Sequence, residues 1–60
     1  MTTIYFIKVS GSRATEDEVL QFRTYHQRAR ALREIKEELA ILFIDDAVIE
    51  LYEEEVDSDG

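Results

Sequence analysis

Apolar residues recur with different periods along the chain, and these periods predict where strands and a helix lie. Residues 3–9 are β-branched or aromatic almost throughout and are followed by Gly11. This composition predicts a strand. Alternate residues of the strand fall on two faces, with Tyr5, Ile7 and Val9 on one and Ile4, Phe6 and Lys8 on the other. Both faces are largely apolar, which is typical of a central strand or of a strand at an interface.

The middle of the chain fits two patterns. In the first, Thr15 and Glu18 form a capping box, and apolar residues recur every three or four positions, which predicts one long helix from about 16 to 42. In the second, residues 19–25 form a strand that pairs back onto the first one, and a helix begins near Gln27. Periodicity slightly favours the long helix, and composition slightly favours the strand followed by a helix.

The last third of the chain predicts a closing strand and a tail. The apolar residues 41–44 run into Asp45 and Asp46, a pair that favours a turn. Residues 47–52 then alternate as a strand does. Residues 53–60 are mostly acidic, and we expect them to form a disordered tail. The sequence therefore predicts a single domain over 1–52 and an acidic tail over 53–60.

The short chain limits how the fold is stabilised. A chain of 60 residues forms one domain and buries only about 60% of the surface that its unfolded form exposes. Small folds usually gain further stability from disulfides, a metal or self-association. The chain has no Cys, and its single histidine, His26, lacks neighbours with zinc-ligand spacing. By elimination we expect a homodimer, and six aromatic residues are many for so small a core, which favours an interface.

The charge of the chain restricts its partners. Fourteen acidic and seven basic residues give a net charge of −7, which repels nucleic acid and attracts basic proteins. The acids form either an ordinary solvated surface or a mimic of DNA in which carboxylates stand for phosphates. No segment approaches the roughly 20 apolar residues of a membrane span, and the N-terminus has no basic signal-peptide region. We therefore expect a cytoplasmic protein that binds neither nucleic acid nor membrane.

Neither catalysis nor a cofactor is expected. No nucleophile and base are paired around His26, and runs such as Glu53 to Glu55 lack the buried setting that shifts a carboxyl pKa. Two glycines are too few for a phosphate-binding loop. The clearest charge feature is instead a basic helix start, at Arg28, Arg30 and Arg33. Pairs with Glu34 and Glu37 one turn later, or the acidic tail of the same or a neighbouring chain, would neutralise it.

Residues 21–27, QFRTYHQ, carry a resemblance to a known family. The pattern Gln-aromatic-x-x-Tyr-His-polar is similar to a strand end in the small dimeric uracil-DNA glycosylase inhibitors encoded by certain phages. That family also has a similar length, an acidic balance and no Cys. The resemblance implies an α+β fold, with a small antiparallel three-stranded sheet and one helix in the order strand-strand-helix-strand. The helix would span 29–39 and the closing strand 46–51, and the alternative remains strand-long helix-strand.

The resemblance also implies how such a protein works. Family members are homodimers that occupy the DNA-binding cleft of the enzyme, where their carboxylates replace phosphates. An apolar groove between the two helices captures the apolar side chain that the enzyme inserts into DNA. The residues that would bind the partner here are Tyr25, Glu34, Ile35, Glu37, Glu38, Leu39 and Leu42.

These residues match the family to different degrees. Tyr25 and His26 match the motif directly, whereas Ile35 falls where the family places a large aromatic residue and Leu39 lies near a helix tyrosine. Thr24 and Lys36 stand where the family has acids, so Glu37 or Glu34 would take the role of the helix acid. The expected function is inhibition of uracil-DNA glycosylase, in the host cytoplasm if a phage encodes the protein. The alternatives are inhibition of another host nucleic-acid enzyme, such as a nuclease, a polymerase or a CRISPR effector, or a homodimeric adaptor.

Overall fold

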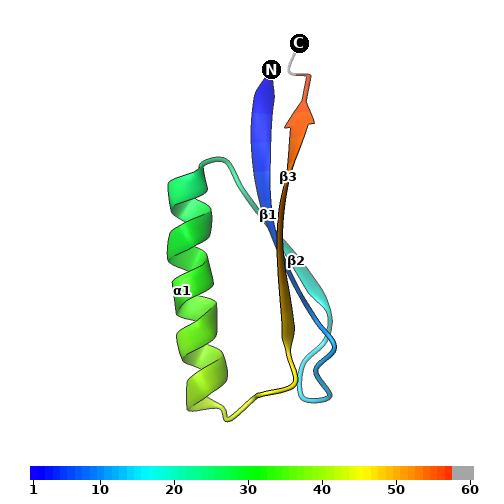
Figure 1. Cartoon of the computed structure of the whole chain (residues 1–60), viewed down its shortest axis with the longest axis vertical. Helices are drawn as coiled ribbons and strands as arrows, with labels where there is room; N and C mark the ends of the chain where they lie inside the picture. Colours follow the sequence, from blue (N-terminus) through cyan, green and yellow to red (C-terminus); the bar gives the residue numbers. More distant parts are fainter. Residues whose placement is uncertain (58–60) are drawn as a thin grey trace.

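The protein consists of a three-stranded sheet with one helix on one of its faces. A computed structural model describes residues 1–57. Its elements follow in the order β1 (Thr2–Ser10), β2 (Glu18–Phe22), α1 (Tyr25–Ile41) and β3 (Val48–Val56). All neighbouring strands are antiparallel, in the sheet order β2-β1-β3 (Figure 1). The α+β class and the order strand-strand-helix-strand are therefore confirmed, and the long helix from 16 to 42 is wrong.

The central strand β1 pairs over different lengths with its two neighbours. It pairs with β3 along its whole length, from Thr2 opposite Val56 to Ser10 opposite Val48, but with β2 only over residues 5–9. The first residues of β1 and the last of β3 thus extend beyond α1 as a two-stranded ribbon (Figure 1). Residues 53–56, which we expected in a tail, belong to this strand because they pair with the backbone of β1. Of the expected tail, residues 58–60 lie outside the described part of the chain.

Thr24 fixes where the helix begins. It is the N-cap of α1, and its hydroxyl accepts a hydrogen bond from the Gln27 backbone N–H at 3.1 Å. The Gln27 side-chain oxygen in turn accepts from the Arg23 N–H at 3.3 Å, so this segment acts much as a capping box does. The expected box at Thr15 is wrong, since that residue lies in the connection between β1 and β2. The expected strand over 19–25 accordingly ends at Phe22, and the helix starts two residues before Gln27.

The helix ends in a Schellman motif with an unusual residue. The Ile44 N–H donates to the Leu39 carbonyl at 2.9 Å, and the Phe43 N–H donates to the Ala40 carbonyl at 3.2 Å. This motif needs a left-handed residue at the position after the C-cap, usually glycine. Phe43 occupies it with φ of 57°. A left-handed conformation costs a non-glycine residue about 1–2 kcal/mol, so Phe43 lowers the free energy of unfolding relative to a glycine at this position.

The core lies between α1 and the sheet and is small. Within residues 1–57, Ile7 and Val9 are the only apolar side chains that are buried, and of these two Ile7 is fully buried. The residues of α1 that lie on the side facing the sheet are buried or half-buried: Arg28, Ala31, Leu32, Ile35 and Leu39. Their spacing of three and four places them on one stripe, which packs on β1 and β2. The other face of the sheet has no covering element in the described chain (Figure 1).

A carboxylate joins the two connections at one end of the molecule. Asp46, before β3, accepts hydrogen bonds from the Ser12 hydroxyl at 2.8 Å and from the Arg13 backbone N–H at 2.9 Å. The backbone N–H of Arg13, and after it the Ser12 hydroxyl, lower the pKa of Asp46 below its usual value of 3.8. These two hydrogen bonds join the connection after β1 to the connection before β3. The bonded residues are 34 and 33 positions apart in the sequence.

The lowered pKa of Asp46 predicts a stability that depends on pH. A carboxyl group whose pKa is lower in the folded than in the unfolded chain stabilises the fold above the unfolded value, and this contribution is lost as pH falls through the folded pKa. We therefore expect Asp46→Asn to lower the melting temperature at pH 7 and the difference from the original chain to shrink below about pH 4. Thermal unfolding followed by circular dichroism measures both. Asp45→Asn, an equal charge change at the neighbouring residue, is the control, and a difference that does not depend on pH would refute the prediction.

Candidate protein-binding surface

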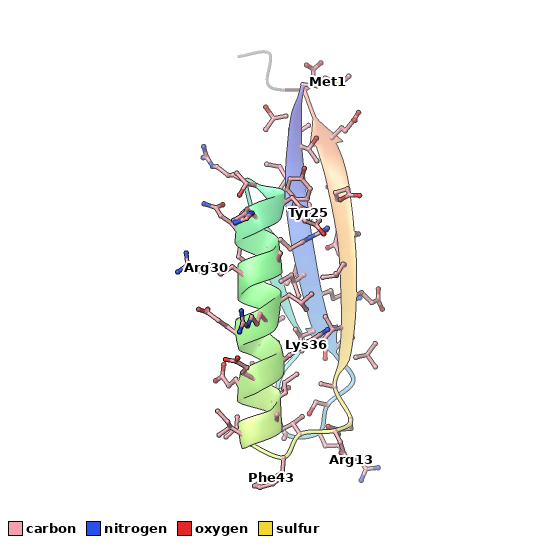
Figure 2. The ribbon with its side chains drawn as sticks, turned by 60° about the vertical axis from the view of Figure 1, so that its left-hand side comes forward. Met1, Arg13, Tyr25, Arg30, Lys36 and Phe43 are labelled. Atoms are coloured by element: carbon pink, nitrogen blue, oxygen red, sulfur yellow. The ribbon has the colours of Figure 1, made fainter. Side chains whose placement is uncertain are left out.

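The residues expected to bind a partner lie in three places. Ile35 and Leu39 are half-buried on the side of α1 that faces the sheet, so in the protomer they belong to the core rather than to an open groove. Tyr25 is exposed at the first turn of the helix, at the opposite end from Phe43 (Figure 2). The ends of a 17-residue helix are about 25 Å apart. Of the other expected residues, Glu34, Glu37 and Glu38 are exposed in the second half of α1, and Leu42 is exposed at its C-cap.

These exposed residues continue into an apolar group at the end of the helix. Ile41, Leu42 and Phe43 are all exposed, and Phe43 is 93% exposed. On the helix the spacing of Glu34, Glu37, Glu38 and Ile41 is three and four, which places them on one outward flank. We call six of the exposed residues of this end the acidic–apolar corner: Glu34, Glu37, Glu38, Ile41, Leu42 and Phe43. Lys36 and Ala40, on the same stretch, are also exposed. The corner combines carboxylates with an apolar tip, as a ligand for a basic surface with an apolar pocket requires.

One carboxylate of the corner is paired within the chain. Arg33 Nε lies 3.8 Å from a Glu37 carboxylate oxygen, and both side chains are mostly exposed. This is one of the two helix pairs expected from sequence, and exposed pairs of this kind contribute only about 0.3–0.5 kcal/mol. Glu37 is therefore free to exchange Arg33 for a cation on a partner at little cost.

Sequence analysis did not single out Phe43, although a signal was present. Residues 41–44 are four consecutive apolar residues at the end of a helix. Successive helical residues point about 100° apart, so such a run cannot turn all its side chains toward one core. At least one had to be exposed, and the left-handed backbone of Phe43 makes it the outermost.

Arg28 is the second residue whose role the sequence did not reveal. It is 7% exposed, and its guanidinium lies over the rings of Tyr5 and Tyr25, at 5.1 and 5.3 Å from their centroids. Its Nη1 donates a hydrogen bond to the Tyr52 carbonyl at 3.1 Å and lies 3.5 Å from a carboxylate oxygen of Glu53. The start of α1 is thus held to β1 and β3, and Glu53, one of the acids that we expected in a tail, pairs with Arg28 within the same chain.

Tyr25 serves this cluster from the outside. Its ring meets the ring of Tyr5 edge to face, with centroids 6.1 Å apart, and covers one side of the Arg28 guanidinium. The neighbouring His26 is exposed. Tyr25 therefore has a structural role within this cluster.

A second set of acids lies along β3. The edge strand β3 and the residue after it expose five carboxylates, at Glu50, Glu53, Glu54, Glu55 and Asp57. Within residues 1–57 no group of three or more His, Asp or Glu side chains is arranged to hold a metal ion. The same part of the chain contains no helix that is long and apolar enough to span a membrane.

Comparison with known proteins does not assign the chain to a family. No family model, no curated protein and no solved structure matches it. The resemblance to the glycosylase inhibitors therefore remains a prediction from residues 21–27 and from the layout of the fold.

Proposed function

We propose that the protein inhibits uracil-DNA glycosylase by occupying its DNA-binding cleft with the acidic–apolar corner. The proposal is based on one observation: three carboxylates in the second half of α1 lie next to three exposed apolar side chains where the helix ends. These residues are Glu34, Glu37, Glu38, Ile41, Leu42 and Phe43. An enzyme that binds DNA presents a basic cleft, because it must neutralise phosphates. The carboxylates supply the complementary charge, and the apolar tip supplies an anchor of the kind that carries most binding energy at protein interfaces.

The fold supports this proposal and changes one part of it. The order strand-strand-helix-strand agrees with the layout that the resemblance implies. The expected apolar groove of Ile35 and Leu39 is closed in the protomer, since both side chains pack toward the sheet. The apolar contact passes instead to Leu42 and its exposed neighbours Ile41 and Phe43.

The proposal predicts inhibition of uracil excision at a near-stoichiometric dose. A surface of net charge −7 is repelled by DNA, so inhibition must come from binding the enzyme and not from covering the substrate. Release of uracil from a labelled duplex by a bacterial uracil-DNA glycosylase is measured against increasing protein. Excision at the full rate in the presence of excess folded protein would reject the proposed target.

Two triple variants test whether the corner makes the contact. The first replaces Glu34, Glu37 and Glu38 by Gln, and the second replaces Glu54, Glu55 and Asp57 by their amides at the far end of the molecule. Each removes three negative charges, so they differ only in position. We expect the first to weaken inhibition and to flatten its salt dependence, because charges near the contact steer encounter within a Debye length of about 8–10 Å. Equal loss in both variants would mean that overall charge, and not the corner, drives binding.

A further inference from the structure

We propose that the uncovered face of the sheet is the interface between two copies of this chain, which stack sheet on sheet with their helices outside. The register of the strands defines this open face. In each strand, the residues of the open face alternate with the residues that face α1. The open face carries Ile4, Phe6, Lys8, Val19, Gln21, Val48, Glu50, Tyr52, Glu54 and Val56. The inference rests on the fold and is independent of the proposed inhibition.

The open face has the apolar content of a core. Phe6 and Tyr52 lie directly opposite each other on β1 and β3, and their rings stack with centroids 4.8 Å apart and an interplanar angle of 8°. Ile4, Val19, Val48 and Val56 surround them on the same face, and the last three are exposed. With only Ile7 and Val9 buried among the described apolar residues, the protomer leaves more large apolar side chains on this face than it buries on the other. A permanent partner on the open face would bury these apolar side chains and so enlarge the small core of the protomer.

The charges on the open face indicate which occupant fits. Lys8 lies opposite Glu50 in the register, and Ile4 lies opposite Glu54. Arg23, just after β2, lines the same hollow as Ile4. With Arg23 at its rim, the face carries two cations and two carboxylates, whereas the chain as a whole carries −7. A second copy of so acidic a protein is repelled by every strongly negative surface but not by this one. A basic partner would favour the acidic–apolar corner, so the balanced face suits self-association.

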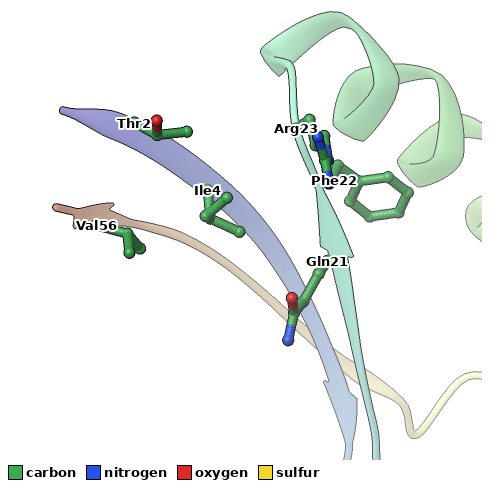
Figure 3. Close-up of a pocket in the computed structure, with 6 residues that line it drawn as sticks. All are labelled: Thr2, Ile4, Gln21, Phe22, Arg23 and Val56. Atoms are coloured by element: carbon green, nitrogen blue, oxygen red, sulfur yellow. The ribbon is translucent and has the colours of Figure 1, made fainter. Parts of the chain in front are cut away.

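The shape of the face also suits a second copy. Near the ribbon end of the molecule, β2 diverges from β1 and leaves a hollow on this face (Figure 3). Thr2, Ile4, Gln21, Phe22, Arg23 and Val56 line it. Strands of nine residues are about 30 Å long, and three strands are about 14 Å wide. Two stacked faces of this size remove on the order of 1,000 Å² from water, which reaches the lower end of specific interfaces. Sheets that pack in this way lie about 10 Å apart.

The solution mass and one pair of variants test the inference. Analytical ultracentrifugation from low micromolar to millimolar concentration should give twice the chain mass of 7.0 kDa. Tyr52→Lys, on the open face, should raise the dissociation constant of the dimer at least about thirtyfold, the loss that an interface hot spot causes. Leu51→Lys is the matched control, since Leu51 is the neighbouring residue on the helix side and is 47% exposed against 37% for Tyr52. A monomer at every concentration, or equal dimerisation of both variants, would overturn the proposal.

A second measurement decides the matter even if Tyr52→Lys does not fold. In a mixture of isotope-labelled and unlabelled wild-type protein, nuclear Overhauser effects between copies should join the ring protons of Phe6 and Tyr52 to methyl groups of Val19, Val48 and Val56. Contacts between copies that involve α1 or only the strand edges would refute the sheet-on-sheet arrangement. A monomer that inhibits glycosylase would refute the dimer alone, and a dimer that does not inhibit would refute the proposed function alone.

Discussion

Replacing Arg28 by Ala is expected to lower the free energy of unfolding by about 2–5 kcal/mol. The loss combines the charged hydrogen bond to the Tyr52 carbonyl, about 1.5–3 kcal/mol, with the contacts of the guanidinium to Tyr5 and Tyr25, about 0.5–2 kcal/mol. The pair with Glu53 adds little, because that carboxylate is mostly exposed and solvent screens it. Domains are stable by about 0.05–0.15 kcal/mol per residue, so the variant of this 60-residue chain should be close to unfolding at 25 °C.

Urea unfolding followed by circular dichroism measures this effect, and two variants separate its parts. Arg33→Ala removes an arginine of the same helix whose side chain is 84% exposed, and it should cost less than about 0.5 kcal/mol. Glu53→Gln removes only the ion pair and should cost less than about 1 kcal/mol. If Arg28→Ala proves as stable as Arg33→Ala, then Arg28 does not hold the helix to the sheet.

Replacing Phe43 by Gly should raise stability and abolish inhibition together. Glycine adopts the left-handed conformation without the clash of a Cβ atom, so the free energy of unfolding should rise by about 1 kcal/mol. Phe43 is almost fully exposed, so the loss of its ring removes few contacts within the protomer. If the ring is the anchor of the acidic–apolar corner, the dose needed to inhibit uracil excision should increase at least about thirtyfold.

Phe43→Ala distinguishes the backbone effect from the effect of the ring. Alanine keeps the unfavourable conformation but lacks the ring, so it should lose inhibition without the gain in stability. Urea unfolding and the excision assay are run on both variants. Full inhibition by Phe43→Gly would show that the corner does not depend on this ring, and unchanged stability would show that the left-handed residue costs nothing.

The sequence predicted the order of the elements better than their ends. The β-branched and aromatic composition of β1 identified it as a strand with two apolar faces, and it is the central strand. The sequence left the start of the helix open, because periodicity slightly favoured a long helix from about 16 and composition slightly favoured a strand followed by a helix near Gln27. Pairing of residues 18–22 with β1 decides between them, and such pairing is a tertiary effect. Glutamates are poor strand formers, so the extension of β3 to Val56 was likewise hidden until its pairing with β1 was seen.

The sequence predicted only part of the candidate site, because the apolar pattern of a helix does not identify what covers each side chain. A stripe with a period of three and four residues identifies one side of a helix but does not say whether a sheet or a partner covers it. Ile35 and Leu39 were thus assigned to a groove although they pack toward the sheet, while Leu42 is exposed as expected. Arg28 lies on the same stripe four residues before Leu32, a position that favoured burial despite its charge. No pattern in the sequence predicted that two tyrosine rings and a carbonyl would surround its guanidinium.

The glutamates of β3 also protect the protein from aggregation. β3 is a nine-residue edge strand, and an unpaired edge of that length offers its N–H and carbonyl groups to strands of other molecules. Glu50, Glu53, Glu54 and Glu55 distribute negative charge along both sides of this edge. Two such edges that approach each other bring like charges within a few ångströms, which opposes pairing. The acids that look like a tail in the sequence thus keep the longest free edge of the sheet from templating fibrils, while the open face of the sheet stays available for stacking.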